Sequence, residues 1–268
     1  MMATEATDNG TIITGDGCRI AYQFDGPDDA PLLLLSNSLG TSLAMWDPQM
    51  EALARDFRIL RYDQRGHGAS DAPAGGYSID RLGRDVVELL DALNISTMDF
   101  CGLSLGGMVG QWLGIREPQR LRRLILANTS AYMGPPEGWD ARIRTVRAKG
   151  MAPLAQASVE RWFTAAFAAA EPTAITPISE MLLASSPQGY GGTCAAIRDM
   201  DMRRMISLIT LPTLVIGGTQ DRATTPLHAE ALASAIANAR LVMLDAAHLS
   251  NVEQPITFTS EILRFLTH

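Results

Sequence analysis

The strongest constraint on the fold is the segment 100–107, which reads FCGLSLGG and places Ser104 in a Gly-x-Ser-x-Gly spacing. That spacing is typical of a sharp turn between a strand and a helix, which exposes the oxygen of the central serine. Gly102 and Gly106 lack a Cβ atom, so the helix can cross close to the strand while the serine holds a strained backbone. Because the spacing also occurs by chance, the flanking segments must decide whether the turn is present.

The flanking sequence supplies both a strand and a helix. Residues 97–101 form a short strand-like run, and residues 105–115 continue as an apolar, Gly-rich stretch that Pro118 ends. Upstream, apolar residues recur at helical spacing over 78–93, behind Ser78 as a helix N-cap. Strand, tight turn and helix therefore follow in the required order. We interpret Ser104 as an exposed nucleophile, rather than as a buried structural serine in a Gly-rich turn.

Strand-like and helix-like segments alternate along most of the 268 residues. An opening hairpin is expected from 11–13 and 19–24, and further helices at 225–236 and 255–266. Short apolar runs predict the other strands at 31–36, 57–62, 97–101, 121–127, 211–217 and 239–244. Alternation of this kind indicates the α/β class, with a mostly parallel central sheet flanked by helices.

One interruption breaks this alternation between Tyr132 and Met205. Strand-like runs vanish there, and alanine, methionine and arginine are frequent; the segment includes the runs 141–148 and 162–167. We predict a helical cap over residues 132–205, inserted into a core formed by 1–131 and 206–268. Such a cap would lie above the carboxyl ends of the strands, where open α/β sheets bind ligands. The alternative is a long insertion that does not contact substrate.

The net charge and the cysteines indicate which binding partners and which cellular compartment fit the sequence. The net charge is −7 and no Lys- or Arg-rich run is present, which argues against nucleic acid and anionic membranes as partners. The N-terminus has neither a basic start nor an apolar segment typical of a secretory signal. Cys18, Cys101 and Cys194 are odd in number and widely spaced, without a disulfide or metal-ligand pattern. We therefore predict a cytoplasmic protein with no metal or organic cofactor; the sequence leaves the oligomeric state open.

A serine nucleophile needs a base, and four histidines are available. His268 is the last residue, and His228 falls on an expected helix surface. His67 lies in a Gly-rich loop after a strand but precedes the serine in the chain. His248 follows the last strand and precedes the closing helix, where a loop can carry it over Ser104. We predict His248 as the base.

The acid that orients this base is expected after an earlier strand. Asp221 lies four residues past Gly217, at the same sheet edge, and the loop 128–130 offers no competing carboxylate. Asp245 is too near its strand end to reach the His248 ring. The chain order Ser104, Asp221, His248 is that of the α/β-hydrolases. The alternative for Asp221 is a solvated loop aspartate.

An oxyanion formed at Ser104 needs two backbone N–H donors. One is expected at Leu105, directly after the nucleophile at a helix N-terminus, where the helix dipole also helps. The other is expected in the loop after the strand 31–36, at Leu39. Ser38, beside Leu39, is placed to hydrogen-bond a substrate.

Four blocks together carry a narrower resemblance: SNSLGT at 36–41, MWDPQ at 45–49, RYDQRGHG at 61–68 and CGLSLGGM at 101–108. With them the chain resembles the 3-oxoadipate enol-lactonases of the α/β-hydrolase superfamily, from the first hairpin to residue 253. The resemblance implies an α/β-hydrolase fold. It also implies opening of a small anionic lactone, 3-oxoadipate enol-lactone, to 3-oxoadipate through an acyl-enzyme, in the degradation of aromatic compounds.

An anionic substrate in an acidic protein requires a local cation. Trp139 and Arg142 are three residues apart in the predicted cap, so on a helix both can face the site, and we predict that the Trp139 N–H and Arg142 bind the substrate carboxylate. The alternative is a solvated basic helix face with Trp139 in the cap core. Two other functions stay open: a C–C bond hydrolase or broad carboxylesterase with the same triad, and a non-catalytic small-molecule receptor.

Overall fold

An eight-stranded sheet forms the centre of the molecule. The computed structural model describes residues 8–267. The strands are β1 (Asp8–Ile13), β2 (Arg19–Asp25), β3 (Leu32–Ser36), β4 (Arg58–Tyr62), β5 (Met98–Leu103), β6 (Leu121–Ala127), β7 (Thr213–Gly218) and β8 (Ala239–Leu244). They pair in the order β1-β2-β4-β3-β5-β6-β7-β8. β2 is antiparallel to β1 and β4, and all later pairings are parallel.

Parallel pairing places the strand ends that carry chemistry at one edge. In β5 and β7 every residue is buried, as expected of strands covered on both faces. Ser36 pairs with Gly102, Leu103 with Ala127, and β6 in turn with β7. The loops after β3, β5, β6 and β7 therefore leave the sheet side by side.

Helices flank this sheet, which confirms the predicted fold class. They are η1 (Leu43–Trp46), α1 (Asp47–Leu53), α2 (Ile79–Ala92), α3 (Leu105–Arg116), η2 (Pro118–Arg120), η3 (Ile206–Leu208), α9 (Pro226–Ala235), α10 (Ser250–Glu253) and α11 (Pro255–Thr267). Ser78 caps α2 as predicted, accepting a hydrogen bond from the Arg81 N–H. No sequence pattern predicted η1 and α1. Met45 and Trp46 of η1 are buried in the core, and the Trp46 ring lies 6.1 Å from that of Phe258.

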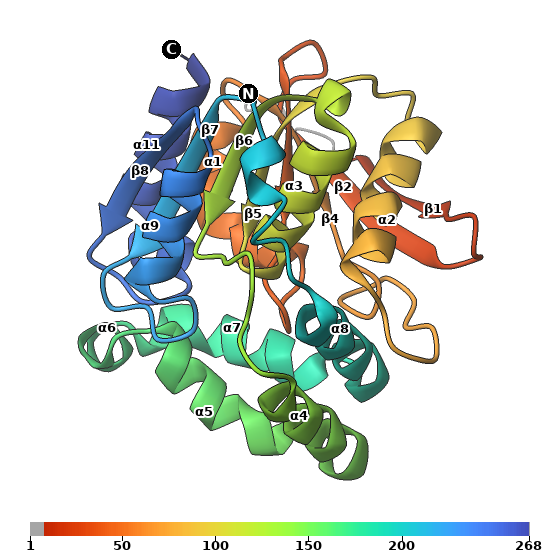
Figure 1. The fold of residues 1–268 in the computed structure, drawn as a ribbon, viewed down its shortest axis with the longest axis vertical. Coiled ribbons are helices and arrows are strands. Elements are labelled where there is room, and N and C mark those ends of the chain that lie inside the picture. Colours follow the sequence, from red (N-terminus) through yellow and green to blue (C-terminus); the bar gives the residue numbers. More distant parts are fainter. Residues whose placement is uncertain (1–7, 268) are drawn as a thin grey trace, which may run out of the picture.

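Five more helices lie between β6 and β7 in the chain. They are α4 (Pro136–Lys149), α5 (Ala152–Trp162), α6 (Ala165–Ala170), α7 (Pro172–Ala184) and α8 (Pro187–Asp199). Figure 1 shows them gathered at one end of the sheet, below the carboxyl ends of the parallel strands. The run 162–167 is not one helix, because α5 ends at Trp162 and Thr164 caps α6 by accepting from the Phe167 N–H. The division into a cap of 132–205 and a core of 1–131 and 206–268 stays a prediction, and residues 1–7 and 268 lie outside the described part.

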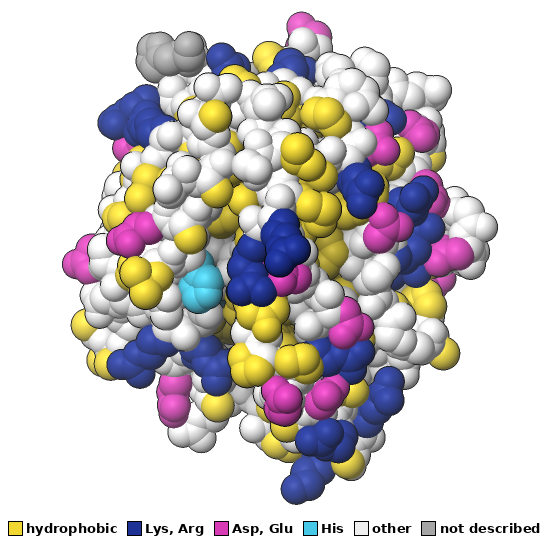
Figure 2. Space-filling view, viewed as in Figure 1, with side chains coloured by type: hydrophobic (Ala, Val, Ile, Leu, Met, Phe, Trp, Pro, Cys, Tyr) yellow, Lys and Arg dark blue, Asp and Glu magenta, His cyan; other side chains and the backbone are white. Residues whose placement is uncertain are grey.

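The molecular surface carries charges of both signs. On the face shown in Figure 2, basic and acidic side chains are interspersed among neutral ones rather than gathered by sign. Within residues 8–267, no helix combines the length and apolar character needed to cross a bilayer.

The turn at Ser104 depends on a close approach between α3 and two strands. A Cβ atom built on Gly106 would lie 2.0 Å from the Ser36 carbonyl oxygen, and one on Gly102 would lie 2.1 Å from the Gly106 carbonyl oxygen. Both obstacles are backbone atoms, which cannot turn aside as a side chain can. Only glycine therefore permits this crossing.

We expect Gly106→Ala to lower the free energy of unfolding by at least about 2 kcal/mol, because the added methyl group forces α3 away from β3. Urea denaturation checks this. The matched control is Gly138→Ala in α4, where no atom lies within 4 Å of the added Cβ and where alanine is expected to raise stability by up to about 1 kcal/mol. Equal midpoints for native protein and Gly106→Ala would contradict the argument.

Candidate active site

Ser104 occupies the turn between β5 and α3 with a strained backbone. Its φ of 56° and ψ of −113° lie in a region that residues with a side chain rarely adopt. The strain is held by hydrogen bonds on both sides: the Ser104 N–H donates to the Ala127 carbonyl at 2.9 Å, and the Thr129 hydroxyl donates to the Ser104 carbonyl at 2.7 Å. The hydroxyl of Ser104 is thereby presented at the carboxyl edge of the sheet.

His248 and Asp221 meet Ser104 from two separate loops. The Ser104 Oγ lies 2.9 Å from His248 Nε2, and His248 Nδ1 lies 2.9 Å from Asp221 Oδ2. His248 follows β8 and Asp221 follows β7, so both come from the same edge as Ser104. All three residues are buried. The structure thus brings the three predicted residues into one hydrogen-bonded chain.

Asp221 accepts side-chain hydrogen bonds from Asn128 and Thr224, two partners that no sequence pattern identified. The Asn128 amide donates to Asp221 Oδ2 at 3.0 Å, and the Thr224 hydroxyl donates to the same oxygen at 2.8 Å. Burial alone would raise the pKa of the Asp221 carboxyl, but His248, Asn128 and Thr224 together hold it at about 2. The carboxylate is therefore ionised at neutral pH. The position of Asn128, directly after β6, was the available signal for its role.

The two predicted oxyanion donors have free N–H groups. Within the described chain, neither the Leu39 nor the Leu105 N–H donates to a protein acceptor. Leu105 is the first residue of α3, whose N–H groups have no partner inside the helix. Leu39 and Ser38 line the cavity in front of Ser104, whereas Leu105 lies buried beneath it.

A cavity of about 160 Å³ opens in front of Ser104 and His248. It is smaller than the roughly 300–1,000 Å³ of sites for drug-sized ligands. Its lining includes three arginines and no Asp or Glu: Arg142 from α4, Arg161 from α5 and Arg222 from the loop after β7. Elsewhere in residues 8–267, no three His, Cys, Asp or Glu side chains are grouped as a metal site. The cavity suits a small anion.

Trp139 and Arg142 both line this cavity, but one predicted contact needs correction. The Trp139 indole N–H donates to the Met133 carbonyl at 3.2 Å, so it is not free for a substrate carboxylate. The indole instead lies against Arg142, whose guanidinium carbon is 5.0 Å from the ring centre. Arg142 also donates to the Tyr190 hydroxyl at 3.3 Å, which aims it into the cavity. No sequence pattern indicated that Arg161, Arg222 and Tyr190 lie at this cavity.

A family model and similar proteins of known function agree on the family of this chain. The family model described as "alpha/beta hydrolase fold" matches residues 31–255. The chain belongs to the α/β-hydrolase family. It is 42% identical to 3-oxoadipate enol-lactonase 2 of Acinetobacter baylyi over 250 residues, which covers 93% of this chain and 94% of the relative.

Solved structures agree with this family assignment. The enol-lactonase from Burkholderia xenovorans is 44% identical, with a TM-score of 0.95, and the match covers 97% of this chain and 100% of that one. A hydrolase from Pseudomonas aeruginosa is 49% identical, with a TM-score of 0.94, and both chains are covered fully. The predicted resemblance to enol-lactonases is confirmed.

Hydrogen bonds hold both ends of the loop that carries Leu39 in this α/β-hydrolase. The Asn37 carbonyl accepts from the Gly106 N–H at 3.0 Å and from the Gln64 amide at 2.7 Å. At the other end, the Gly40 N–H donates to His67 Nε2 at 3.0 Å. His67 is thus not the base but a support for the loop after β3.

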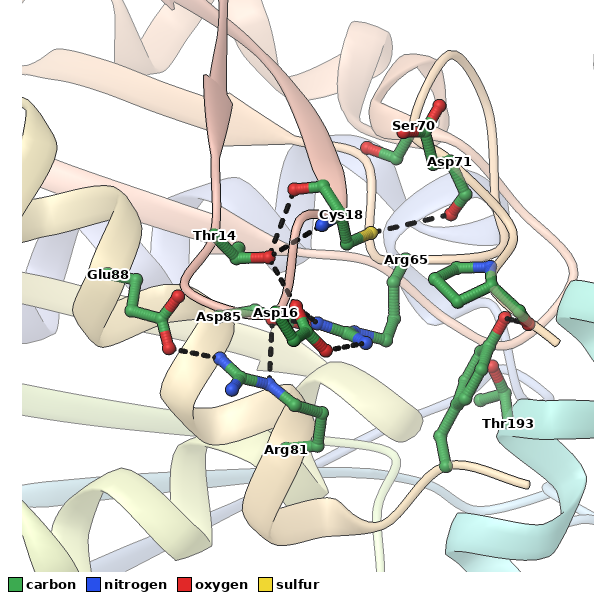
Figure 3. Close-up of polar contacts among 12 residues, drawn as sticks. Thr14, Asp16, Cys18, Arg65, Ser70, Asp71, Arg81, Asp85, Glu88 and Thr193 are labelled. Atoms are coloured by element: carbon green, nitrogen blue, oxygen red, sulfur yellow. Dashed lines mark hydrogen bonds and ion pairs between the residues drawn. The ribbon is translucent and has the colours of Figure 1, made fainter. Parts of the chain in front are cut away.

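The segment that holds His67 is itself fixed by a buried ion pair (Figure 3). Arg65 binds Asp85 of α2 through two hydrogen bonds of 2.6 Å, and it binds Asp16 of the β1–β2 turn at 2.9 and 3.1 Å. Bidentate pairs of this kind fix orientation as well as distance. The Arg65 carbonyl then lies 3.3 Å from His67 Nδ1, so this nitrogen carries the hydrogen and Nε2 is left to accept from Gly40.

The buried His67 of the hydrolase makes stability depend on pH. Burial lowers the pKa of its imidazole to about 4, against 6.5 when the chain is unfolded. Between these values the unfolded chain binds a proton that the folded protein does not, so stability is full above pH 6.5 and falls on acidification. We expect this group to remove about 2 kcal/mol between pH 6.5 and pH 5.

Urea denaturation at several pH values tests this with His67→Gln, which keeps an acceptor for the Gly40 N–H but cannot titrate. The loss of stability on acidification should be smaller in the variant by about 2 kcal/mol over that interval, whatever its stability at pH 7. Parallel stability curves for the two proteins would show that His67 is not the titrating group.

Proposed function

We propose that this α/β-hydrolase opens 3-oxoadipate enol-lactone to 3-oxoadipate with Ser104 as the nucleophile. One observation carries the proposal: the chain Ser104–His248–Asp221 faces a small cavity whose described lining holds three arginines and no carboxylate. The enol-lactonases from Acinetobacter baylyi and Burkholderia xenovorans, at 42% and 44% identity, support the same substrate.

In the first step the Ser104 oxygen attacks the lactone carbonyl while His248 Nε2 takes its proton. The 2.9 Å hydrogen bond between these atoms is the path of that proton. Asp221, ionised and bonded to His248 Nδ1, holds the ring in the required tautomer and stabilises the imidazolium. The N–H groups of Leu39 and Leu105 stabilise the negative charge on the carbonyl oxygen.

In the second step the ring C–O bond breaks and its oxygen leaves as an enolate. An enolate is a good leaving group, and it takes up a proton to become the ketone. The substrate then remains bound to Ser104 as an ester, and a water molecule activated by His248 hydrolyses this acyl-enzyme. The products are the dicarboxylic keto acid and the free serine, and one water molecule is consumed.

Recognition of the substrate carboxylate is assigned to Arg142. Its guanidinium is oriented by Tyr190 and lies against the Trp139 ring, and it takes part in none of the ion pairs found within residues 8–267. The Ser38 hydroxyl lines the same cavity and offers a further hydrogen bond. A larger, mainly apolar pocket would suit a C–C bond hydrolase or a broad esterase better.

We also assign the protein to the degradation of aromatic compounds in the cytoplasm. Supporting the compartment, Cys18, Cys101 and Cys194 are buried free thiols, which suit a reducing environment. The pathway follows from the proposed substrate.

The function is tested by the turnover of 3-oxoadipate enol-lactone, followed through its ultraviolet absorbance. Native protein should open the lactone, and Ser104→Ala should lose at least about 10³-fold in kcat because the nucleophile is gone. Ser260→Ala in α11 is the matched control, since it removes an exposed serine hydroxyl far from the site. Hydrolysis of a neutral aryl ester by native protein, without any opening of the lactone, would overturn the substrate assignment.

Substitution of Arg142 should weaken substrate binding, measured by KM, without changing the chemical step, measured by kcat. We expect Arg142→Gln to raise the KM for the lactone about 10- to 100-fold, because one charge-assisted contact to the carboxylate is lost, while kcat changes little. The KM for a neutral aryl ester should stay the same. Arg144→Gln, an exposed position on the same helix, is the control. An unchanged lactone KM in Arg142→Gln would rule out this arginine as the carboxylate ligand.

A further inference from the structure

Two arginines line both the cavity in front of Ser104 and a second, larger groove. A groove of about 840 Å³ runs between the α5–α6 segment and the loop after β7. Its lining shares two residues with the cavity in front of Ser104, and both are arginines: Arg161 and Arg222. Arg161 and Arg222 therefore border both the groove and the cavity in front of Ser104.

The two arginines come from elements that are held against the catalytic loops. Arg161 lies in the last turn of α5, and the carbonyl of the next residue, Trp162, accepts a 3.0 Å hydrogen bond from the Leu249 N–H. Leu249 directly follows His248. Glu253 joins the same parts, since its carboxylate accepts from the Ala247 N–H at 2.9 Å and from the Thr164 hydroxyl. The end of α5, with Arg161, is thus held against the loop that carries His248.

Within the described residues neither arginine is paired with a carboxylate, although Asp221 and Glu160 also line the groove. Within residues 8–267, neither Arg161 nor Arg222 belongs to an ion pair or donates a hydrogen bond to another side chain. Burial, and then the neighbouring Arg142, lower the pKa of Arg161. Of the two acids that line the groove, Asp221 is committed to His248, and Glu160 accepts from the Gln156 amide.

We propose that Arg161 and Arg222 form a cationic portal that draws small carboxylate substrates from this groove to Ser104. The protein as a whole carries a net charge of −7, which repels an anion at long range. The cavity in front of Ser104, which Arg161 and Arg222 also line, has arginines and no carboxylate in its described lining. A cleft lined by one sign of charge concentrates the opposite ion locally and raises its rate of association. The portal assigns to Arg161 and Arg222 a role in capture, distinct from the contact that Arg142 makes with the bound substrate. It rests on the proposed function only in that the substrate is an anion.

The test uses Arg222, because its exposed side chain can be changed without disturbing the core. At low ionic strength, Arg222→Gln should lower kcat/KM for the lactone about threefold to tenfold and leave kcat unchanged. The loss should vanish in 1 M NaCl, where charges are screened beyond about 3 Å. Arg222→Lys should retain the native kcat/KM, since steering needs the charge rather than the guanidinium geometry. Arg161→Gln should behave as Arg222→Gln does.

Two controls make the result specific. Arg147→Gln changes the net charge equally at an exposed site on α4 that lines neither cavity, and it should match native protein. 4-Nitrophenyl pentanoate and 4-nitrophenyl hemiglutarate differ mainly in the terminal carboxylate, and only the second should respond to Arg222→Gln, with Ser104→Ala as background. This ester pair tests the portal even where the lactone is not a substrate. Equal kcat/KM for Arg222→Gln and Arg147→Gln, or equal losses with both esters, would overturn the portal.

Discussion

The crossing of α3 over the strands at Ser104 is the contact on which the rest of the site depends. The two glycines of the turn allow backbone to meet backbone, and Ser104 is held at a φ of 56° between them. That crossing brings the first N–H groups of α3 to the loop after β3, where the Gly106 N–H binds the Asn37 carbonyl. The proposed nucleophile and both proposed oxyanion donors are therefore placed by one packing constraint.

Support for the site extends outward in successive hydrogen bonds rather than ending at three residues. Asp221 depends on Asn128 and Thr224, and the loop with Leu39 depends on His67, which in turn depends on Arg65. The supporting groups are neutral, as Asn128, Thr224 and His67 are, or paired, as Arg65 is with Asp85 and Asp16, so their burial leaves no unpaired charge among them. The same hydrogen-bond network therefore supports the fold and the proposed active site. For this reason we expect the titration of the buried His67 to change the free energy of unfolding.

The three arginines that line the cavity differ in their contacts. Arg142 is held by the Tyr190 hydroxyl and the Trp139 ring, which suits the carboxylate contact proposed for it. Arg161 and Arg222 make no such contacts within the described chain and form the proposed portal. A fixed cation suits recognition, whereas cations without rigid partners suit attraction of an anion in solution. An acidic protein can serve an anionic substrate in this way.

The sequence by itself determined the fold class, the strand–turn–helix at Ser104, and the choice of His248 and Asp221. Each of these follows from local patterning and from chain order, because parallel strands deliver their following loops to one edge. Only the tertiary structure decided which distant residues form hydrogen bonds at the site. Asn128 donates to Asp221, the Gly40 N–H donates to His67, and the Met133 carbonyl accepts from the Trp139 N–H. The cavity arginines belong to the same class, since helix periodicity says which residues share a face but not which face meets the catalytic serine.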